Sequence, residues 1–144
     1  MINKIMDGIT RALYEEFGDK FRIYTEDSEQ GMEEPCFFVS CISPTDERWL
    51  GDRRKLTNKF SIQYFPYTDE PKRECNAIRD RLTIALEYID TTDGKIEGTS
   101  FSSEMTNGFL TTFVNYNCFA YRIVERDPVM EEMSMKGGLK NGNR

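Results

Sequence analysis

The sequence of 144 residues contains no histidine. It therefore lacks the side chain that most often acts as a general base near neutral pH, and neither a Ser-His nor a Cys-His nucleophile can be built. The longest apolar runs are far shorter than the roughly 20 residues that cross a bilayer, and the first ten residues, MINKIMDGIT, contain no continuous apolar stretch of the secretory type. We expect a protein made in a cytosol, without a membrane span and not an enzyme, although carboxylate, lysine or tyrosine chemistry stays open.

Signatures of metal and nucleotide sites are missing as well. No CxxC pair is present, and without histidine a zinc site would need an all-cysteine or carboxylate-assisted set of ligands. No glycine-rich phosphate motif stands between a strand and a helix. We predict no metal and no cofactor, and we interpret the four scattered cysteines as buried thiols: Cys36, Cys41, Cys75 and Cys118.

The composition suits one globular domain. Hydrophobic residues make up 38% of the chain and charged residues 31%. A chain of this length buries roughly two thirds of the surface that its unfolded form exposes, so no disulfide or metal is needed to hold the fold. The net charge of -6 disfavours gripping a phosphate backbone, because such binding uses Lys and Arg to release counterions.

Hydrophobic periodicity predicts two helices and five strands. Helical spacing indicates a first helix that ends near Gly18 and a second that follows Pro71 and runs to about Ile89. Strands are expected over residues 21–25, 36–42, 55–65, 95–106 and 109–124, with a polar connection over residues 43–54. This order, α-β-β-β-α-β-β, predicts a single α+β domain over residues 1–126, with a mostly antiparallel or mixed sheet and both helices packed on one face. Residues 127–144 are expected to form a flexible C-terminal tail.

The dipeptide Asn107-Gly108 predicts a tight hairpin, because a type I′ turn needs positive φ at both central positions. A two-residue turn fixes the register, so that Thr106 pairs with Phe109, Met105 with Leu110, and Phe101 with Val114. One face of the hairpin then covers the helices. The other face is polar but carries large apolar groups that include Phe109 and Phe113, and a bulge would exchange later residues between the two faces.

Two loops of opposite charge are the most informative surface feature. Residues 26–34 carry five acids and no base, whereas residues 48–59 carry five bases and one acid. Both loops could be hydrated or could meet within one subunit. Alternatively, the basic loop of one copy meets the acidic loop of the next in a head-to-tail contact that closes into a ring, and reversing Arg53 and Arg54 to Glu then prevents assembly. The charged candidates for this contact are Glu29, Glu33, Glu34, Arg48, Arg53 and Arg54.

Several apolar residues raise the same question of contact between subunits. Trp49 lies in the polar connection, where it acts either as a lid over its own core or as an interface anchor. Phe109 and Phe113 pack either under a loop of their own chain or against a neighbour. Met133 and Met135 belong to a terminus that could add as a strand to a neighbour's sheet edge, or stay disordered until a partner arrives.

Three segments together resemble the tail terminator family of phages and prophages of Gram-positive bacteria. They are EQGMEEPCFFV at residues 29–39, FSIQYFP at residues 60–66, and residues 96–116 with the Asn-Gly hairpin. The resemblance covers nearly the whole chain in order. It implies a structural virion tail protein, assembled in the host cytoplasm as a ring of six subunits. Its implied partners are its own copies, the tail tube protein and the head connector, with DNA passing through unbound.

Two other readings stay open. A head-completion or connector protein of the phage neck is the nearest rival, and tail length separates the two. Loss of a terminator gives overlong tubes, whereas loss of a connector leaves normal tails and unjoined heads. A small cytosolic binding module or a carboxylate-based enzyme is the alternative from another class, and a monomer with a deep acidic pocket would favour it.

Overall fold

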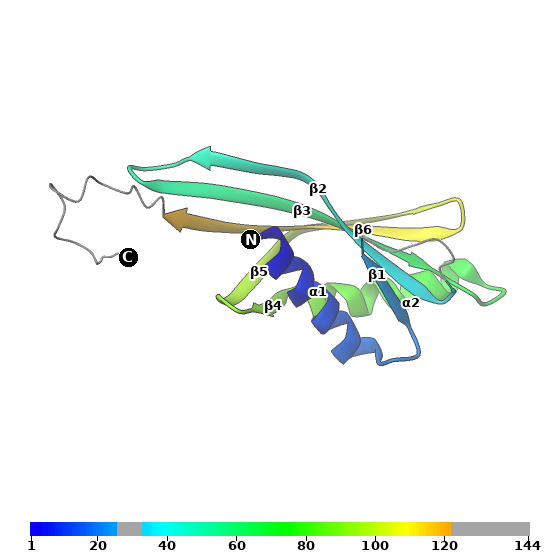
Figure 1. Cartoon of the computed structure of the whole chain (residues 1–144). Helices are drawn as coiled ribbons and strands as arrows, with labels where there is room; N and C mark the ends of the chain where they lie inside the picture. Colours follow the sequence, from blue (N-terminus) through cyan, green and yellow to red (C-terminus); the bar gives the residue numbers. More distant parts are fainter. Residues whose placement is uncertain (26–32, 122–144) are drawn as a thin grey trace, which may run out of the picture. The chain divides into compact units, whose positions relative to one another are not determined.

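The computed structural model describes residues 1–25 and 33–121 (Figure 1). The chain divides into two compact units. The main unit comprises residues 1–45 and 57–118, and the tip unit comprises residues 46–56 together with the chain from Phe119 onward. The elements in order are α1 (Ile2–Phe17), β1 (Arg22–Thr25), β2 (Cys36–Arg48), β3 (Arg53–Phe65), α2 (Pro71–Leu86), β4 (Tyr88–Thr91), β5 (Gly94–Thr106) and β6 (Phe109–Tyr121). The expected flexible tail over residues 127–144 lies outside the described residues.

The six strands form one mixed sheet in the order β1-β2-β3-β6-β5-β4. β1 runs parallel to β2, while β5 pairs with β4 and β6 in antiparallel fashion. Both helices lie on the same side of the sheet (Figure 1), and they contact each other, β4 and β5. The predicted α+β class and helix placement are confirmed, and the predicted elements occur in the predicted order, with one further strand, β4, that was not predicted.

The apolar stripe of α1 forms a large part of the hydrophobic core. Ile5, Ile9 and Leu13 are fully buried, as their helical spacing predicted. They pack against side chains that alternate along the central strands, so the sheet contributes every second residue to the same cluster. The strand members of this cluster are Phe37, Val39, Phe60, Ile62, Tyr64, Leu110, Val114 and Tyr116.

The second helix is shorter than predicted. α2 ends at Leu86, and Ile89 belongs to β4, where it pairs with Ile96 of β5. Ile89 is nevertheless buried, at 1% exposure. Because a buried residue continues the apolar spacing whether it stands on a helix or on the following strand, periodicity alone placed it in the helix.

The β5-β6 hairpin keeps the predicted register near its turn and departs from it farther along. Thr106 pairs with Phe109 and Met105 with Leu110, as expected. The expected pairing of Phe101 with Val114 is not regular, because the register shifts between Thr99 and Ser102. Ser100, with φ of 56°, supplies the extra residue of this bulge. The bulge turns Gly98 toward the core, where it stands opposite Tyr116.

The polar connection expected over residues 43–54 is mostly strand. β2 continues to Arg48, β3 begins at Arg53, and a tight turn joins them. The end of β2 from Pro44 to Arg48 is exposed. A strand that is exposed on both faces carries no alternation of apolar and polar residues, so its sequence reads as a loop.

Candidate interaction surfaces

The turn of the tip unit is held by its own backbone. Trp49 N–H donates to the Arg53 carbonyl at 2.9 Å, and Arg53 N–H donates to the Leu50 carbonyl at 2.9 Å. Gly51 adopts φ of 57°, a conformation that favours glycine. These bonds present Leu50 at the end of the hairpin with 64% of its surface exposed.

Beside this turn, two aromatic rings pack against each other, and one cation contacts each ring. We call this set of four side chains the ladder. The Lys55 ammonium lies 5.1 Å from the Trp49 ring, the Trp49 and Phe119 rings are 5.9 Å apart, and the Arg53 guanidinium lies 5.2 Å from the Phe119 ring. Such cation–π contacts are worth about 0.5–1 kcal/mol each at exposed sites. Trp49 and Phe119 are each 48% exposed. The ladder therefore fixes two half-exposed aromatic side chains in place, which suits a rigid docking surface.

The predicted basic residues of the tip unit have different surroundings. Arg54 Nε lies 2.6 Å from the Asp46 carboxylate, and Arg53 stacks on Phe119. Arg48 is exposed at the end of β2. The structure therefore brings Arg53 and Arg54 into contacts inside the tip unit and presents Arg48 to solvent.

The acidic loop is described only at its end. Glu33 forms an ion pair with Arg22 at 3.0 Å, and its N–H donates to the Tyr24 hydroxyl at 3.2 Å. Glu34 is exposed. Glu29 lies outside the described residues, as do Met133 and Met135. Glu33 thus forms an ion pair within the main unit, and the sequence did not predict this pair.

The sheet face turned away from the helices carries the predicted phenylalanines. We call this the outer sheet face, formed by alternate residues of β3 and β6. Phe109 stacks on Phe65 with ring centroids 4.9 Å apart, and the Lys59 ammonium lies 4.9 Å from the Phe113 ring. These aromatics are only partly exposed, because neighbouring side chains shield one another across the strands. The residues of this face are Lys59, Ser61, Gln63, Phe65, Phe109, Thr111 and Phe113.

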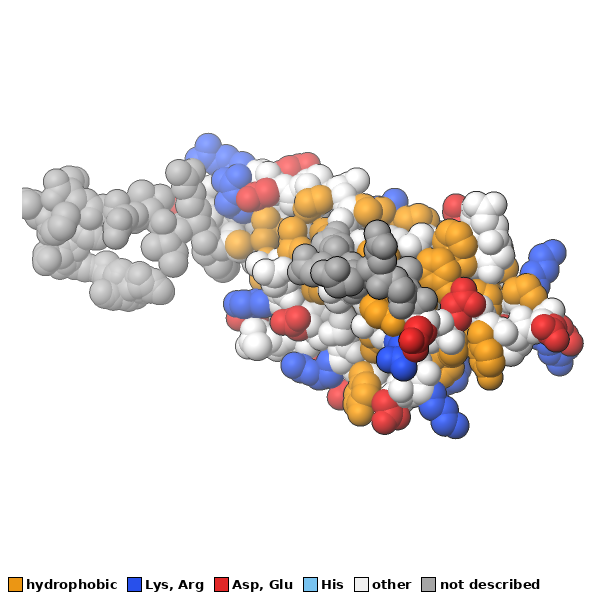
Figure 2. Space-filling view, turned by 45° about the vertical axis from the view of Figure 1, so that its right-hand side comes forward, with side chains coloured by type: hydrophobic (Ala, Val, Ile, Leu, Met, Phe, Trp, Pro, Cys, Tyr) orange, Lys and Arg blue, Asp and Glu red, His pale blue; other side chains and the backbone are white. Residues whose placement is uncertain are grey.

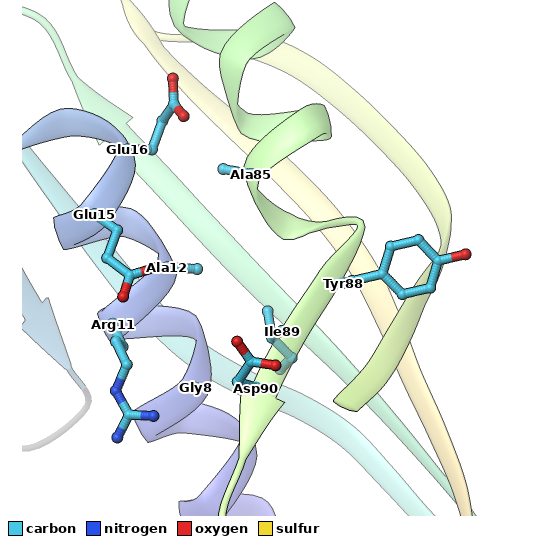
Figure 3. Close-up of a pocket in the computed structure, with 9 residues that line it drawn as sticks. All are labelled: Gly8, Arg11, Ala12, Glu15, Glu16, Ala85, Tyr88, Ile89 and Asp90. Atoms are coloured by element: carbon cyan, nitrogen blue, oxygen red, sulfur yellow. The ribbon is translucent and has the colours of Figure 1, made fainter. Parts of the chain in front are cut away.

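A groove of about 170 Å³ lies between α1, the end of α2 and β4 (Figure 3). Gly8 and Ala12 lie four residues apart on one face of α1, and Gly8 lets β4 come close, because a Cβ there would lie 2.9 Å from the Asp90 carbonyl oxygen. Two acids of the lining already have partners, since Glu16 pairs with Arg81 and Asp90 with Lys95. The nine residues that line the groove include no cysteine, serine or lysine. This groove was not predicted from the sequence, where only the small residues at helical spacing could have indicated it.

The buried titratable groups are structural. Burial raises the pKa of the Cys36 and Cys75 thiols, with the nearby carboxylates Glu34 and Glu74 acting in the same direction. Burial likewise raises the pKa of Tyr116, whose hydroxyl donates to the Leu86 carbonyl at 2.6 Å. These groups therefore keep their protons near neutral pH. Within residues 1–25 and 33–121, no three Cys, Asp or Glu side chains gather closely enough to hold a metal ion.

Apolar and charged side chains are mixed on the surface of the described residues. On the face shown in Figure 2, hydrophobic side chains form small islands between charged ones. Small exposed apolar islands are normal on a folded domain and do not by themselves mark a contact surface. In the part of the chain that the structure describes, no helix is long and apolar enough to span a membrane.

The family model described as phage tail terminator protein matches residues 4–128, which include α1 from Lys4 onward, α2 and all six strands. Comparison with curated proteins gave no match.

Proposed function

Because this chain belongs to the phage tail terminator family, we propose that it forms a ring on the last tier of a tail tube, stops tube growth and joins the tail to the head connector. The match over residues 4–128 is the observation that carries this proposal. The family is one of structural tail proteins and not of enzymes. We propose the virion tail as the mature location and six as the number of subunits in the ring.

The division of charge between the two units supports assembly from identical copies. The main unit carries ten Lys and Arg against eighteen Asp and Glu, whereas the residues of the tip unit carry nine against seven. A contact between the tip unit of one copy and the main unit of the next therefore joins opposite charges. Such a contact is heterologous, and it closes into a ring when the rotation between copies permits.

The tip unit supplies apolar anchors for this contact. Trp49 and Leu50 are exposed at the turn and are flanked by Arg48, and the ladder with Phe119 fixes the tryptophan ring. Trp and Arg are enriched among the few residues that carry most of the binding energy of an interface. We propose that Arg48, Trp49 and Leu50 make the contact, while Arg53 and Arg54 shape the hairpin that presents them.

The acidic side of the contact is the loop over residues 26–34. Glu34 is exposed at its end, and Glu29 is proposed as a second contact. Glu33 contributes less because Arg22 already neutralises it at 3.0 Å. Phe109 and Phe113 of the outer sheet face are proposed to meet the tail tube protein or the connector.

The negative charge of the main unit also suits a ring through which DNA moves. An acidic surface repels phosphate, so DNA passes without adhering. No specific contact with DNA is proposed.

Tail length in the assembled phage tests the function. When the gene is disrupted, we expect tubes that exceed the normal length, because nothing stops their polymerisation. Expression of the protein from a plasmid should restore normal tails. Tails of normal length with unjoined heads would contradict the proposal and favour a connector role in the neck.

Charge reversal tests the tip contact. The double variant Arg48→Glu with Leu50→Ser should lower the particle mass in light scattering to that of single chains. The matched control is Arg79→Glu, which makes the same change of charge on the exposed face of α2. Equal masses for the two variants would show that the tip unit does not hold the ring.

A further inference from the structure

The groove between α1, the end of α2 and β4 combines small apolar side chains with a charged rim. Ala12 and Ala85 point into it from opposite sides, and Ile89 lies beside them (Figure 3). Its volume is about 170 Å³. Because an engineered cavity of about 150 Å³ holds a benzene molecule, this groove has room for one apolar side chain of leucine size.

The rim of the groove carries one cation and one anion that are not paired within the described chain. Glu16 pairs with Arg81 and Asp90 with Lys95. Arg11 and Glu15 are exposed, and neither forms an ion pair with any residue of 1–25 or 33–121. They lie four residues apart on α1, so they are neighbours on the surface of the helix. The rim therefore offers one charge of each sign to a binding partner.

The turn of the tip unit carries the complementary set of side chains. Leu50 is 64% exposed at the end of this turn. Arg48 and Asp52 stand two residues before and after it, and both are exposed. Neither of the two forms an ion pair with another described residue. One apolar side chain between a cation and an anion matches what the groove can receive.

We infer that the tip turn of one copy docks in this groove of the next copy, with Leu50 between Ala12 and Ala85. The cation of the turn then lies beside Glu15 and its anion beside Arg11, so both charges meet the opposite sign. The inference rests on the proposed head-to-tail assembly. It identifies the surface of the main unit that receives the apolar side chain of the tip.

The groove and the acidic loop can serve the same contact. Residues 26–34 supply charge, but Met32 is their one large apolar side chain, whereas the single chain leaves Leu50 mostly uncovered. Both surfaces adjoin α1: Glu33 pairs with Arg22, five residues beyond the helix, and the last turns of the helix line the groove. A standard interface covers about 800 Å² on each partner, which is enough for one neighbour to contact both.

An exchange of charges tests the docking in the full chain. Arg48→Glu and Glu15→Arg each place like charges together, so each should lower the salt concentration that dissociates the ring at least about twofold. The two changes combined restore opposite charges and should return this concentration toward the wild-type value. The matched control combines Arg48→Glu with Glu104→Arg, which makes the same change of charge at an exposed position of β5 and should give no rescue.

Photo-crosslinking locates the receiving surface directly. With Trp49→p-benzoylphenylalanine, irradiation of assembled protein should link two chains, and the links should map to residues 8–16 or 85–90. Ala85→Phe fills the groove and should lower the yield of this link at least about tenfold. Ala77→Phe, at an exposed position of the same helix, is the matched control and should retain the link.

The remaining outcomes distinguish the docking from the ring. Links that map only to residues 26–34 or elsewhere, links within one chain, or equal rescue by the two charge exchanges would overturn the docking while the ring stands. Protein that stays monomeric both in solution and on purified tail tubes would overturn the ring, and the docking with it.

Discussion

At the scale of single residues, the Glu74 carboxylate organises the segment between β3 and α2. It accepts hydrogen bonds from the Tyr64 hydroxyl, from the backbone N–H of Tyr67 at 3.3 Å, and from both the N–H and the hydroxyl of Thr68. Burial by itself would raise the pKa of this carboxyl, but the bonds from Thr68, Tyr64 and Tyr67 outweigh it and lower the pKa. The folded protein therefore stabilises the ionised form of Glu74.

This lowered pKa predicts a loss of stability in acid. A carboxyl whose pKa is lower in the folded state stabilises the protein above its ordinary pKa of about 4.3 and loses that contribution as the pH falls through the folded value. Glu74→Gln should lower the free energy of unfolding at pH 7 by about 1–3 kcal/mol. The difference from the wild-type protein should shrink in denaturation curves taken below about pH 4. A constant difference at both pH values would refute this role.

Arg81 is a second residue whose contacts reach across elements. Its Nη2 donates to the Glu16 carbonyl at 2.7 Å, its Nε pairs with the Glu16 carboxylate at 3.0 Å, and its guanidinium lies 4.4 Å from the Phe17 ring. α1 has no basic residue in its own last turn. Arg81 thus supplies from α2 the positive charge that a helix C-terminus favours.

Removing Arg81 should therefore loosen the helix pair. Arg81→Ala is expected to lower the free energy of unfolding by about 1–2 kcal/mol. Arg81→Lys should recover only part of this, because an ammonium cannot make the forked contact. Arg79→Ala on the same helix is the control, since the ion pair that Arg79 forms among the described residues is with its neighbour Asp80, at 3.6 Å. Equal melting temperatures for the Arg79 and Arg81 variants would contradict the assignment.

At the scale of elements, the bulge in β5 allows α2 to end close to the sheet. Gly98 faces the core, and a Cβ there would lie 2.6 Å from the Leu86 carbonyl oxygen and 2.9 Å from Val114. The Tyr116 hydroxyl and the Gly98 N–H both bond to carbonyls at this end of the helix. The closest of these contacts is with a backbone carbonyl oxygen, which cannot move aside as a flexible side chain can.

Gly98→Ala should consequently destabilise the protein by about 1–3 kcal/mol through overpacking. The expected measurement is a lower denaturant midpoint with an unchanged slope. Thr99→Ala, at the neighbouring exposed position, should change the midpoint little. If the two variants unfold at the same denaturant concentration, β5 must be able to shift without cost.

The same elements show what the sequence could and could not predict. The Asn107-Gly108 turn and the stripe of α1 are local signals, so the hairpin register near the turn and the first helix were predicted correctly. The bulge at Ser100 depends on packing against α2, and β4 depends on pairing with β5. Neither leaves a local signal. The charge pattern located the two loops but could not show that Arg54 pairs with Asp46 and Glu33 with Arg22.

At the scale of the whole molecule, charge is distributed unevenly along the chain. The main unit has an excess of acids, although the tip unit has slightly more bases than acids. Net charge of one sign keeps single copies apart, and a local excess of the other sign selects one orientation of approach. The segregated charge is therefore compatible with a head-to-tail contact and disfavours a symmetric one between two main units.

This distribution predicts that assembly depends on salt. The Debye length falls from about 10 Å at 0.1 M ionic strength to about 3 Å at 1 M, so attraction between exposed charges of neighbouring copies is largely screened. In sedimentation experiments, the proposed ring should dissociate toward chains of 16.8 kDa as the salt concentration rises. The wild-type protein and the Arg79→Glu control should respond alike, while Arg48→Glu should dissociate at lower salt. A particle indifferent to salt would instead be held by apolar contacts, such as Trp49 and Leu50 at the tip, because these do not weaken when charges are screened.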